Sequence, residues 1–199
     1  MVAALRAEID AGNAQGGLHM QLVIDEPKAF SGFLAHYGKF RGVSNYIALI
    51  GEKGDRLDEK VGYYGERAAL YAQTLGLNTC WVAATFGKST VKKSCAIGKK
   101  ERLVCVIALG YGETQGAPHK SKPLGELYTA AGDIPEWFHA GMEAARLAPT
   151  AMNQQKFLFA LSGDTVMAES TGGPYSKVDL GIVKAHFEIG AGTENFRWA

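Results

Sequence analysis

Runs of apolar residues, separated by short polar and glycine-containing breaks, predict strands along most of the chain. The run Arg102–Gly110 is almost entirely apolar, which is typical of a strand covered on both faces of a sheet. Two runs near the end are separated only by Ser162-Gly163-Asp164, which predicts a β-hairpin. The strands expected from these patterns are His19–Ile24, Asn45–Ile50, Asn78–Ala84, Arg102–Gly110, Lys156–Leu161 and Val166–Ser170.

Helical spacing of apolar residues fills the segments between these strands. The expected helices are Val2–Ala11, Pro27–Tyr37, Leu57–Leu75, Lys88–Lys93 (or a basic loop), Pro135–Leu147 and Asp179–Ala191. Asp133 and Asp179 are suited to cap the last two of these helices. Gly76 is placed to end the long helix in a left-handed conformation.

The long helix and the last helix both carry small residues at spacings of three or four. Gly62, Gly65 and Ala69 form such a stripe in the first, and Gly181 and Ala185 belong to the second. A glycine inside a helix costs about 1 kcal/mol, which close packing against another helix would offset. We therefore expect the two helices to pack together; surface tolerance of small residues is the alternative.

These elements indicate an α+β fold with a central mixed or antiparallel sheet, flanked by helices that include a long central one. The segments Asn45–Gly76 and Lys156–Gly192 share the order strand, turn and small-faced helix, which indicates a weak internal repeat or a chance likeness. We expect one domain, 1–199, with pseudo-repeated halves at about 1–123 and 124–199.

Bulk properties exclude several classes of protein. The chain has 199 residues and a formal net charge of +1, which gives no reason to expect nucleic acid as a partner. No apolar run is long enough to cross a bilayer and no signal peptide is visible, so we expect no membrane association and a cytoplasmic location. The three cysteines, Cys80, Cys95 and Cys105, have no C-x-x-C spacing, which argues against a disulfide framework and against a zinc site. Cys80 and Cys105 lie in apolar runs and are expected to be buried.

Three segments could contact a ligand. In the loop 148–157, Asn153 offers a donor and an acceptor together, as a pyrimidine-type ring edge requires; an Asx turn is the alternative, which spacing alone favours. Where the strand 78–84 ends, the backbone N–H groups of Ala83, Ala84 or Gly87 could contact a flat ligand, whereas Trp81 by itself favours a core position. Lys120 and Lys122 could bind a phosphate, or belong to a solvated basic loop.

A fourth segment, His36–Gly42, is basic and aromatic, and it either flanks a pocket or is an ordinary loop with packed aromatic side chains. Nucleotide-binding glycine motifs, a nucleophile elbow and metal-ligand spacings of histidine are all missing from the sequence. No catalytic side chain and no metal are therefore indicated. If the chain is an enzyme, a cofactor supplies the reactive atom.

In their order and spacing, three segments together resemble the nitroreductase family. Gly65–Trp81 is similar to its long central helix followed by L-G-L-x-T-C-W. Ala148–Phe157 is similar to its A-P-[ST]-A-x-N-x-Q-P-[WF] loop, with Lys156 in place of the proline. Gly110–Gly112 and Lys120–Pro123 are similar to its G-Y-P and K-x-R-x-P segments. The resemblance extends from Val2 to Trp198, and it is strongest to a small branch with an internally duplicated arrangement.

The resemblance implies a nitroreductase-like fold and an FMN-dependent oxidoreductase that takes electrons from NAD(P)H and passes them to nitroaromatics, quinones or similar small acceptors. It implies that Asn153 contacts the flavin ring or ribityl chain, with Gln155 as a weaker candidate. The backbone of Trp81, Ala83 and Ala84 would lie at the flavin edge, and Lys120 and Lys122 at the phosphate. Family members are usually homodimers, whereas an internal repeat would allow a monomeric pseudo-dimer.

The family usually opens with a helix that carries R-R-S-x-R, whose arginines hold the FMN phosphate. No such motif precedes Val2, so we expect weaker FMN binding. Our hypothesis for turnover is a ping-pong cycle, in which the nucleotide leaves before the acceptor takes its place. A non-catalytic flavin or small-ligand binding protein is the alternative, and a purely structural protein with the same fold is a third.

Overall fold

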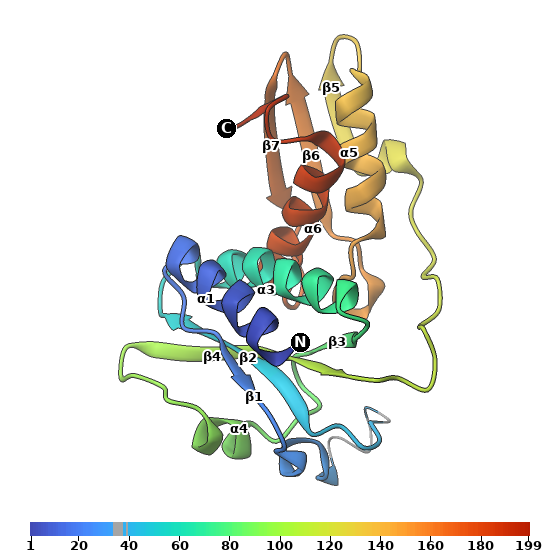
Figure 1. Ribbon diagram of the computed structural model, residues 1–199. Coiled ribbons are helices and arrows are strands. Elements are labelled where there is room, and N and C mark those ends of the chain that lie inside the picture. Colours follow the sequence, from blue (N-terminus) through green and yellow to red (C-terminus); the bar gives the residue numbers. More distant parts are fainter. Residues whose placement is uncertain (34–37, 39) are drawn as a thin grey trace. The chain divides into compact units, whose positions relative to one another are not determined.

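The computed structural model describes residues 1–33, 38 and 40–199 (Figure 1). The chain forms two compact units that are interleaved along the sequence: Met1–Leu57 with Arg67–Gly116, and Asp58–Glu66 with Ala117–Ala199. The expectation of a single domain with pseudo-repeated halves stays a prediction. Among the described residues, no helix is both long and apolar enough to span a bilayer.

The first unit contains an antiparallel sheet with the strand order β1-β2-β4-β3. Its strands are β1 (Gln21–Val23), β2 (Asn45–Glu52), β3 (Asn78–Val82) and β4 (Glu101–Gly110). The apolar pattern correctly indicated that β4 is internal, since it pairs with both β2 and β3. Figure 1 shows α1 (Val2–Gly16) on one side of this sheet and α4 (Lys88–Ser94) on the other.

One face of this sheet builds a buried cluster around Tyr46, Ile50 and Val106, which includes Phe86 and Val91 from the α4 side. The 3₁₀ helix η1 (Pro27–Phe30) adds Phe30 to the same cluster. The remainder of the helix expected over 27–37 includes residues 34–37, which lie outside the described residues. Residues 36, 37 and 39 of the loop 36–42 lie outside them too.

Cys80, in the strand expected over 78–84, was predicted to be buried, and this was wrong. β3 ends at Val82, and Cys80 is exposed. The physical reason is the position of β3 in the sheet. Among the described residues β3 is an edge strand that pairs with β4 alone, so it is covered less than β4, which has a strand on each side. Cys105, on β4, is buried as expected.

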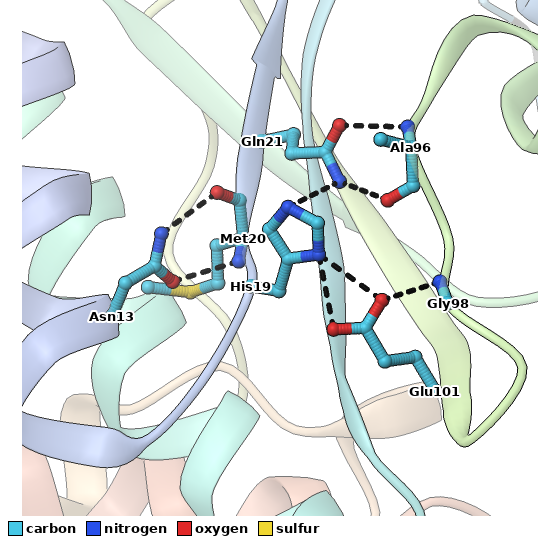
Figure 2. Close-up of polar contacts among 7 residues, drawn as sticks. All are labelled: Asn13, His19, Met20, Gln21, Ala96, Gly98 and Glu101. Atoms are coloured by element: carbon cyan, nitrogen blue, oxygen red, sulfur yellow. Dashed lines mark hydrogen bonds and ion pairs between the residues drawn. The ribbon is translucent and has the colours of Figure 1, made fainter.

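A group of polar contacts joins the start of β1 to the start of β4 and the segment before it (Figure 2). It is formed by His19, Gln21 and Glu101. His19 Nδ1 lies 3.0 Å from Glu101 Oε1, and the Gly98 N–H donates to Glu101 Oε2 at 2.7 Å. Gln21 exchanges two hydrogen bonds with the Ala96 backbone, at 2.7 and 3.0 Å. The Gly98 N–H, and then His19, hold the pKa of Glu101 below its ordinary value.

The second unit contains a mixed sheet with the strand order β5-β6-β7-β8. Its strands are β5 (Tyr128–Ala131), β6 (Phe157–Ser162), β7 (Thr165–Ser170) and β8 (Arg197–Trp198). The predicted hairpin is confirmed as β6 and β7, which pair antiparallel. β5 pairs with β6, and β8 with β7, in parallel. The α+β class is confirmed, although the strands form two sheets instead of one central sheet.

Two helices of the second unit, α5 (Glu136–Leu147) and α6 (Ser176–Ala191), pack with this sheet around an aromatic core. Phe187 of α6 stacks on Phe159 of β6, with ring centroids 4.9 Å apart, and meets Phe138 of α5 edge-on. Asp133 was predicted to cap α5, but Pro135 occupies the N-cap position, and no side chain in the described part of the chain caps this helix end.

The helix α3 (Leu57–Thr74) contributes its residues 58–66 to the second unit, where they touch α6 backbone to backbone. A Cβ atom at Gly62 would lie 2.0 Å from the Val178 carbonyl oxygen, and one at Gly181 would lie 2.0 Å from the Glu59 carbonyl oxygen. Close packing of the two small-faced helices is therefore confirmed at this crossing. A deeper internal repeat stays a prediction.

Ion pairs and hydrogen bonds lie along the same α3–α6 crossing. Lys184 pairs with Glu59 at 2.5 Å, and His186 with the buried Glu66 at 2.8 Å. The Tyr63 hydroxyl donates to Glu188. These bonds satisfy polar groups that the close helix contact removes from water.

Gly62→Ala should lower the free energy of unfolding by about 2 kcal/mol or more, because the added methyl group forces the helices apart. This loss exceeds the gain of about 1 kcal/mol that alanine brings inside a helix. Urea denaturation measures it. Gly125→Ala is the matched control, since a Cβ there meets nothing within 4 Å, and it should change stability by less than about 0.5 kcal/mol. An unchanged midpoint for Gly62→Ala would contradict the close contact.

Glu101→Gln should cost less than about 1 kcal/mol at pH 7, because the ion pair is partly exposed. A carboxyl group with a lowered folded pKa stabilises the fold above its ordinary value of 4.5, and that contribution is lost as the pH falls through the folded pKa. The stability difference from the parent chain should therefore shrink below pH 4.5. Urea denaturation at pH 7 and pH 3 measures it, with the exposed Glu113→Gln as control. A difference that is the same at both pH values would refute this account.

Candidate functional site

The loop after α5 has an unusual backbone. Ala148 is extended because Pro149 follows it and disfavours the helical conformation. The 3₁₀ turn η3 (Ala151–Asn153) comes next, and the backbone is left-handed at Met152 (φ 53°), Asn153 (φ 52°) and Gln155 (φ 46°). Each left-handed residue other than glycine costs about 1–2 kcal/mol. The surrounding hydrogen bonds must therefore hold the loop in this form.

Bonds to Thr150 and Ala151 supply part of that restraint. The N–H of Asn153 donates to the Thr150 carbonyl at 2.9 Å, and the N–H of Gln154 donates to the Ala151 carbonyl at 3.1 Å. The N–H of Gln155 donates to Thr150 Oγ1 at 3.1 Å. The Asx turn at Asn153 that spacing alone favoured is wrong: Asn153 Oδ1 accepts from the side-chain amide Gln155 Nε2 at 2.9 Å, while the Gln155 N–H donates to Thr150. The side-chain amides of Asn153 and Gln155 also bond to another segment.

That segment is Lys120–Lys122, to which the side-chain amides of Asn153 and Gln155 are hydrogen-bonded. Asn153 Nδ2 and Gln155 Nε2 both donate to the Lys120 carbonyl, at 2.8 and 2.9 Å. The Lys122 N–H donates to Gln155 Oε1 at 2.8 Å, and Lys122 Nζ donates to the Gln155 carbonyl at 3.0 Å. The structure thus brings together Lys120, Lys122, Asn153 and Gln155, which we call the amide–lysine cluster.

The donors of this cluster suit an anionic group beside a polar ring or chain. Lys120 and Asn153 are exposed, and Lys122 is half-buried. Asn153 uses one amide proton on Lys120, which leaves its second proton for another acceptor. Gln155 is only 3% exposed, so its amide does not face solvent. Its role is to hold the other residues of the cluster in place through hydrogen bonds. Ammonium and amide groups are the donors that a phosphate or a ring carbonyl accepts from, so these residues fit the phosphate and polar parts of FMN.

The remaining predicted contacts lie in the first unit. Trp81 is half-buried on β3, opposite Ile107 of β4. Ala83 and Ala84 follow the last residue of β3, where the backbone leaves the sheet. Their approach to a flavin edge stays a prediction.

Asp179 is a site residue that the sequence pattern assigned to another role. It was predicted to cap the last helix, but α6 begins at Ser176 with Tyr175 as N-cap, so Asp179 lies in the first turn. Its Oδ1 accepts from the Ala151 N–H at 3.0 Å, and its Oδ2 accepts from Gln154 Nε2 at 2.7 Å. Desolvation raises the pKa of this carboxyl group. An acid at a helix start was the only local signal, and it fits a cap equally well.

The first unit also has an open hollow of about 1520 Å³, lined by the start of α1 and by parts of β3 and β4. Exposed Met1, Val2 and Tyr111 border it, and Cys80 lies in its wall. Desolvation raises the pKa of the Cys80 thiol, so the thiol is protonated at neutral pH and is a poor nucleophile. Of the described residues that line the hollow, none was predicted to bind a cofactor.

Comparison with known proteins supports the resemblance. A solved structure from Thermotoga maritima, described as a "putative nitroreductase", is 22% identical, with a TM-score of 0.59; the match covers 86% of this chain and 64% of that one, so this chain spans less than two thirds of its length. An "FMN-dependent Nitroreductase" from Clostridium difficile is 17% identical, with a TM-score of 0.44, and the match covers 59% of this chain and 80% of that one.

A "Nitroreductase Family Protein" from Streptococcus pneumoniae is 15% identical, with a TM-score of 0.48 and coverage of 61% and 86%. No curated protein matches the chain. A family profile described as "Putative TM nitroreductase" matches residues 1–191. The match extends over almost the whole chain, and the Thermotoga structure shares its fold. The chain therefore belongs to this nitroreductase family.

Proposed function

We propose that this chain is an FMN-dependent oxidoreductase that uses NAD(P)H to reduce nitroaromatic, quinone or similar small acceptors by a ping-pong mechanism. Membership of a nitroreductase family supports an oxidoreductase activity. The observation that carries the proposal is the amide–lysine cluster, in which two lysines and two amides from separate segments are joined by hydrogen bonds.

In this proposal each residue of the cluster has a binding role. The Lys120 and Lys122 ammonium groups hold the phosphate, and Asn153 uses its free amide proton and the remaining lone pair of Oδ1 on the ring or ribityl chain. Gln155 orients the other three from its buried position. The backbone at Ala83 and Ala84 is proposed to line the flavin edge.

When bound, FMN supplies the hydride and electron chemistry. The protein binds and orients the cofactor and the substrates, and it excludes water from them. No side chain is assigned as acid, base or nucleophile. One binding face serves the nucleotide and the acceptor in turn, which is the physical basis of ping-pong kinetics. We place the activity in the cytoplasm, in a monomeric pseudo-dimer or a homodimer.

A non-catalytic flavin-binding protein is the second candidate. Lys156 favours it, since a flexible exposed cation stands where the family pattern has a rigid proline.

Lys120→Ala should weaken FMN binding by about 10- to 100-fold, the effect of losing one charge-assisted bond of about 1.5–3 kcal/mol. Riboflavin lacks the phosphate, so its affinity should change little. Flavin fluorescence titration measures both dissociation constants. Lys177→Ala removes an exposed cation from α6 in the same unit and is the matched control. Equal weakening for both flavins would contradict a phosphate role for Lys120.

The chain with FMN should oxidise NADH or NADPH when a quinone or nitroaromatic is present, and Lys120→Ala should lose rate only at limiting FMN. Excess FMN should restore the rate, because Lys120 acts in binding alone. Absorbance at the nucleotide band follows the reaction. Flavin that binds but is reduced by neither nucleotide would establish the non-catalytic reading. Failure to bind flavin at all would favour a purely structural role.

A further inference from the structure

We propose that Asp179 is a positioning residue for the phosphate end of the cofactor, acting through the loop 150–156 on the segment Lys120–Lys122. The inference rests on the proposed function, because it concerns the same cluster. It assigns to a carboxylate on α6 the task of presenting lysines from a segment more than 50 residues earlier in the chain.

The first step is the pair of hydrogen bonds by which Asp179 holds the loop. Its side chain is only 3% exposed, and its two oxygens bond to Ala151 and Gln154, which lie 28 and 25 residues earlier. An ionised carboxylate accepts at both oxygens and forms stronger bonds than a neutral acceptor. Gln154 donates with the same amide nitrogen to the Pro174 carbonyl at 2.8 Å, which joins the loop to the segment before α6.

The second step concerns the strained residues. The bonds at Ala151 and Gln154 bracket Met152 and Asn153, which are both left-handed. Left-handed backbone at such residues persists only where the surroundings enforce it. Without the carboxylate, the pair can relax to negative φ, and relaxation at Asn153 turns its amide away from the Lys120 carbonyl.

The third step joins the loop to the lysines. Asn153 and Gln155 share the Lys120 carbonyl as acceptor, and Gln155 Oε1 accepts from the Lys122 N–H. These bonds fix the backbone from which the Lys120 side chain extends. When the loop relaxes, the backbone that directs the lysine side chains is therefore no longer held.

Burial supports a role other than stability for this carboxylate. Desolvation raises its pKa, so the unfolded state favours the ionised form more than the folded state does. Above the folded pKa, ionised Asp179 therefore lowers the stability of the fold. Asp179→Asn removes that cost and keeps an acceptor for Ala151, but it turns an amide donor toward the Gln154 donor.

The test measures the dissociation constant of riboflavin divided by that of FMN, in the parent chain and in each variant. Because the two flavins differ only in the phosphate, this ratio reports the phosphate contact alone. Asp179→Ala should lower this ratio about tenfold, and Asp179→Asn by a smaller factor without loss of thermal stability. Glu188→Ala is the matched control: it also removes a carboxylate of α6, one bonded to Tyr63 and Trp198, and it should keep the parent ratio. A parent-like ratio in Asp179→Ala overturns the proposal.

Amide hydrogen exchange supplies a readout without flavin. Asp179→Ala should speed exchange in both 150–156 and 120–122, relative to Glu188→Ala. Faster exchange in 150–156 alone, or in neither segment, overturns the transmission to the lysines. If the parent chain binds no flavin, the proposed function fails, and the exchange data still decide whether Asp179 orders the lysine segment.

Discussion

The backbone contact between α3 and α6 at Gly62 and Gly181 is the constraint on which the second unit depends. A side chain at either glycine would overlap a carbonyl oxygen of the other helix, so this separation is open only to glycine. Asp179 lies two residues before Gly181, and therefore the crossing also fixes where the Asp179 carboxylate meets the loop after α5. Packing in the core and order in the candidate site are thus set by the same short stretch of α6.

The candidate site itself is a case of local strain balanced by hydrogen bonds. Met152, Asn153 and Gln155 adopt backbone conformations that are unfavourable alone, and the loop is held by bonds to Thr150, Ala151 and Asp179. Strain of this kind is found where a binding group must be held in one direction. A loop that is ordered before the ligand arrives loses less entropy on binding, which raises affinity without any additional contact.

Much of the fold could be predicted, because its strongest elements are locally encoded. The continuous apolar run of β4, the hairpin β6–β7 and the long helix α3 all follow from periodicity and turn residues. Gly76 ends α3 with φ +81°, as its position predicted. The strands β5 and β8 were missed: they have 4 and 2 residues, and each pairs in parallel with a strand that is distant along the chain.

By itself the sequence determined the α+β class, most helices and strands, the small-residue faces of α3 and α6, and the family resemblance, since each depends on residues close together in the chain. Only the tertiary structure decided that β3 is an edge strand with Cys80 exposed, that Asn153 and Gln155 hold Lys120 and Lys122, and that Asp179 serves the loop instead of capping its own helix. The physical reason is that a hydrogen bond or a covered face requires a partner. No local pattern states which of many distant donors and acceptors the folded chain will bring within 3 Å.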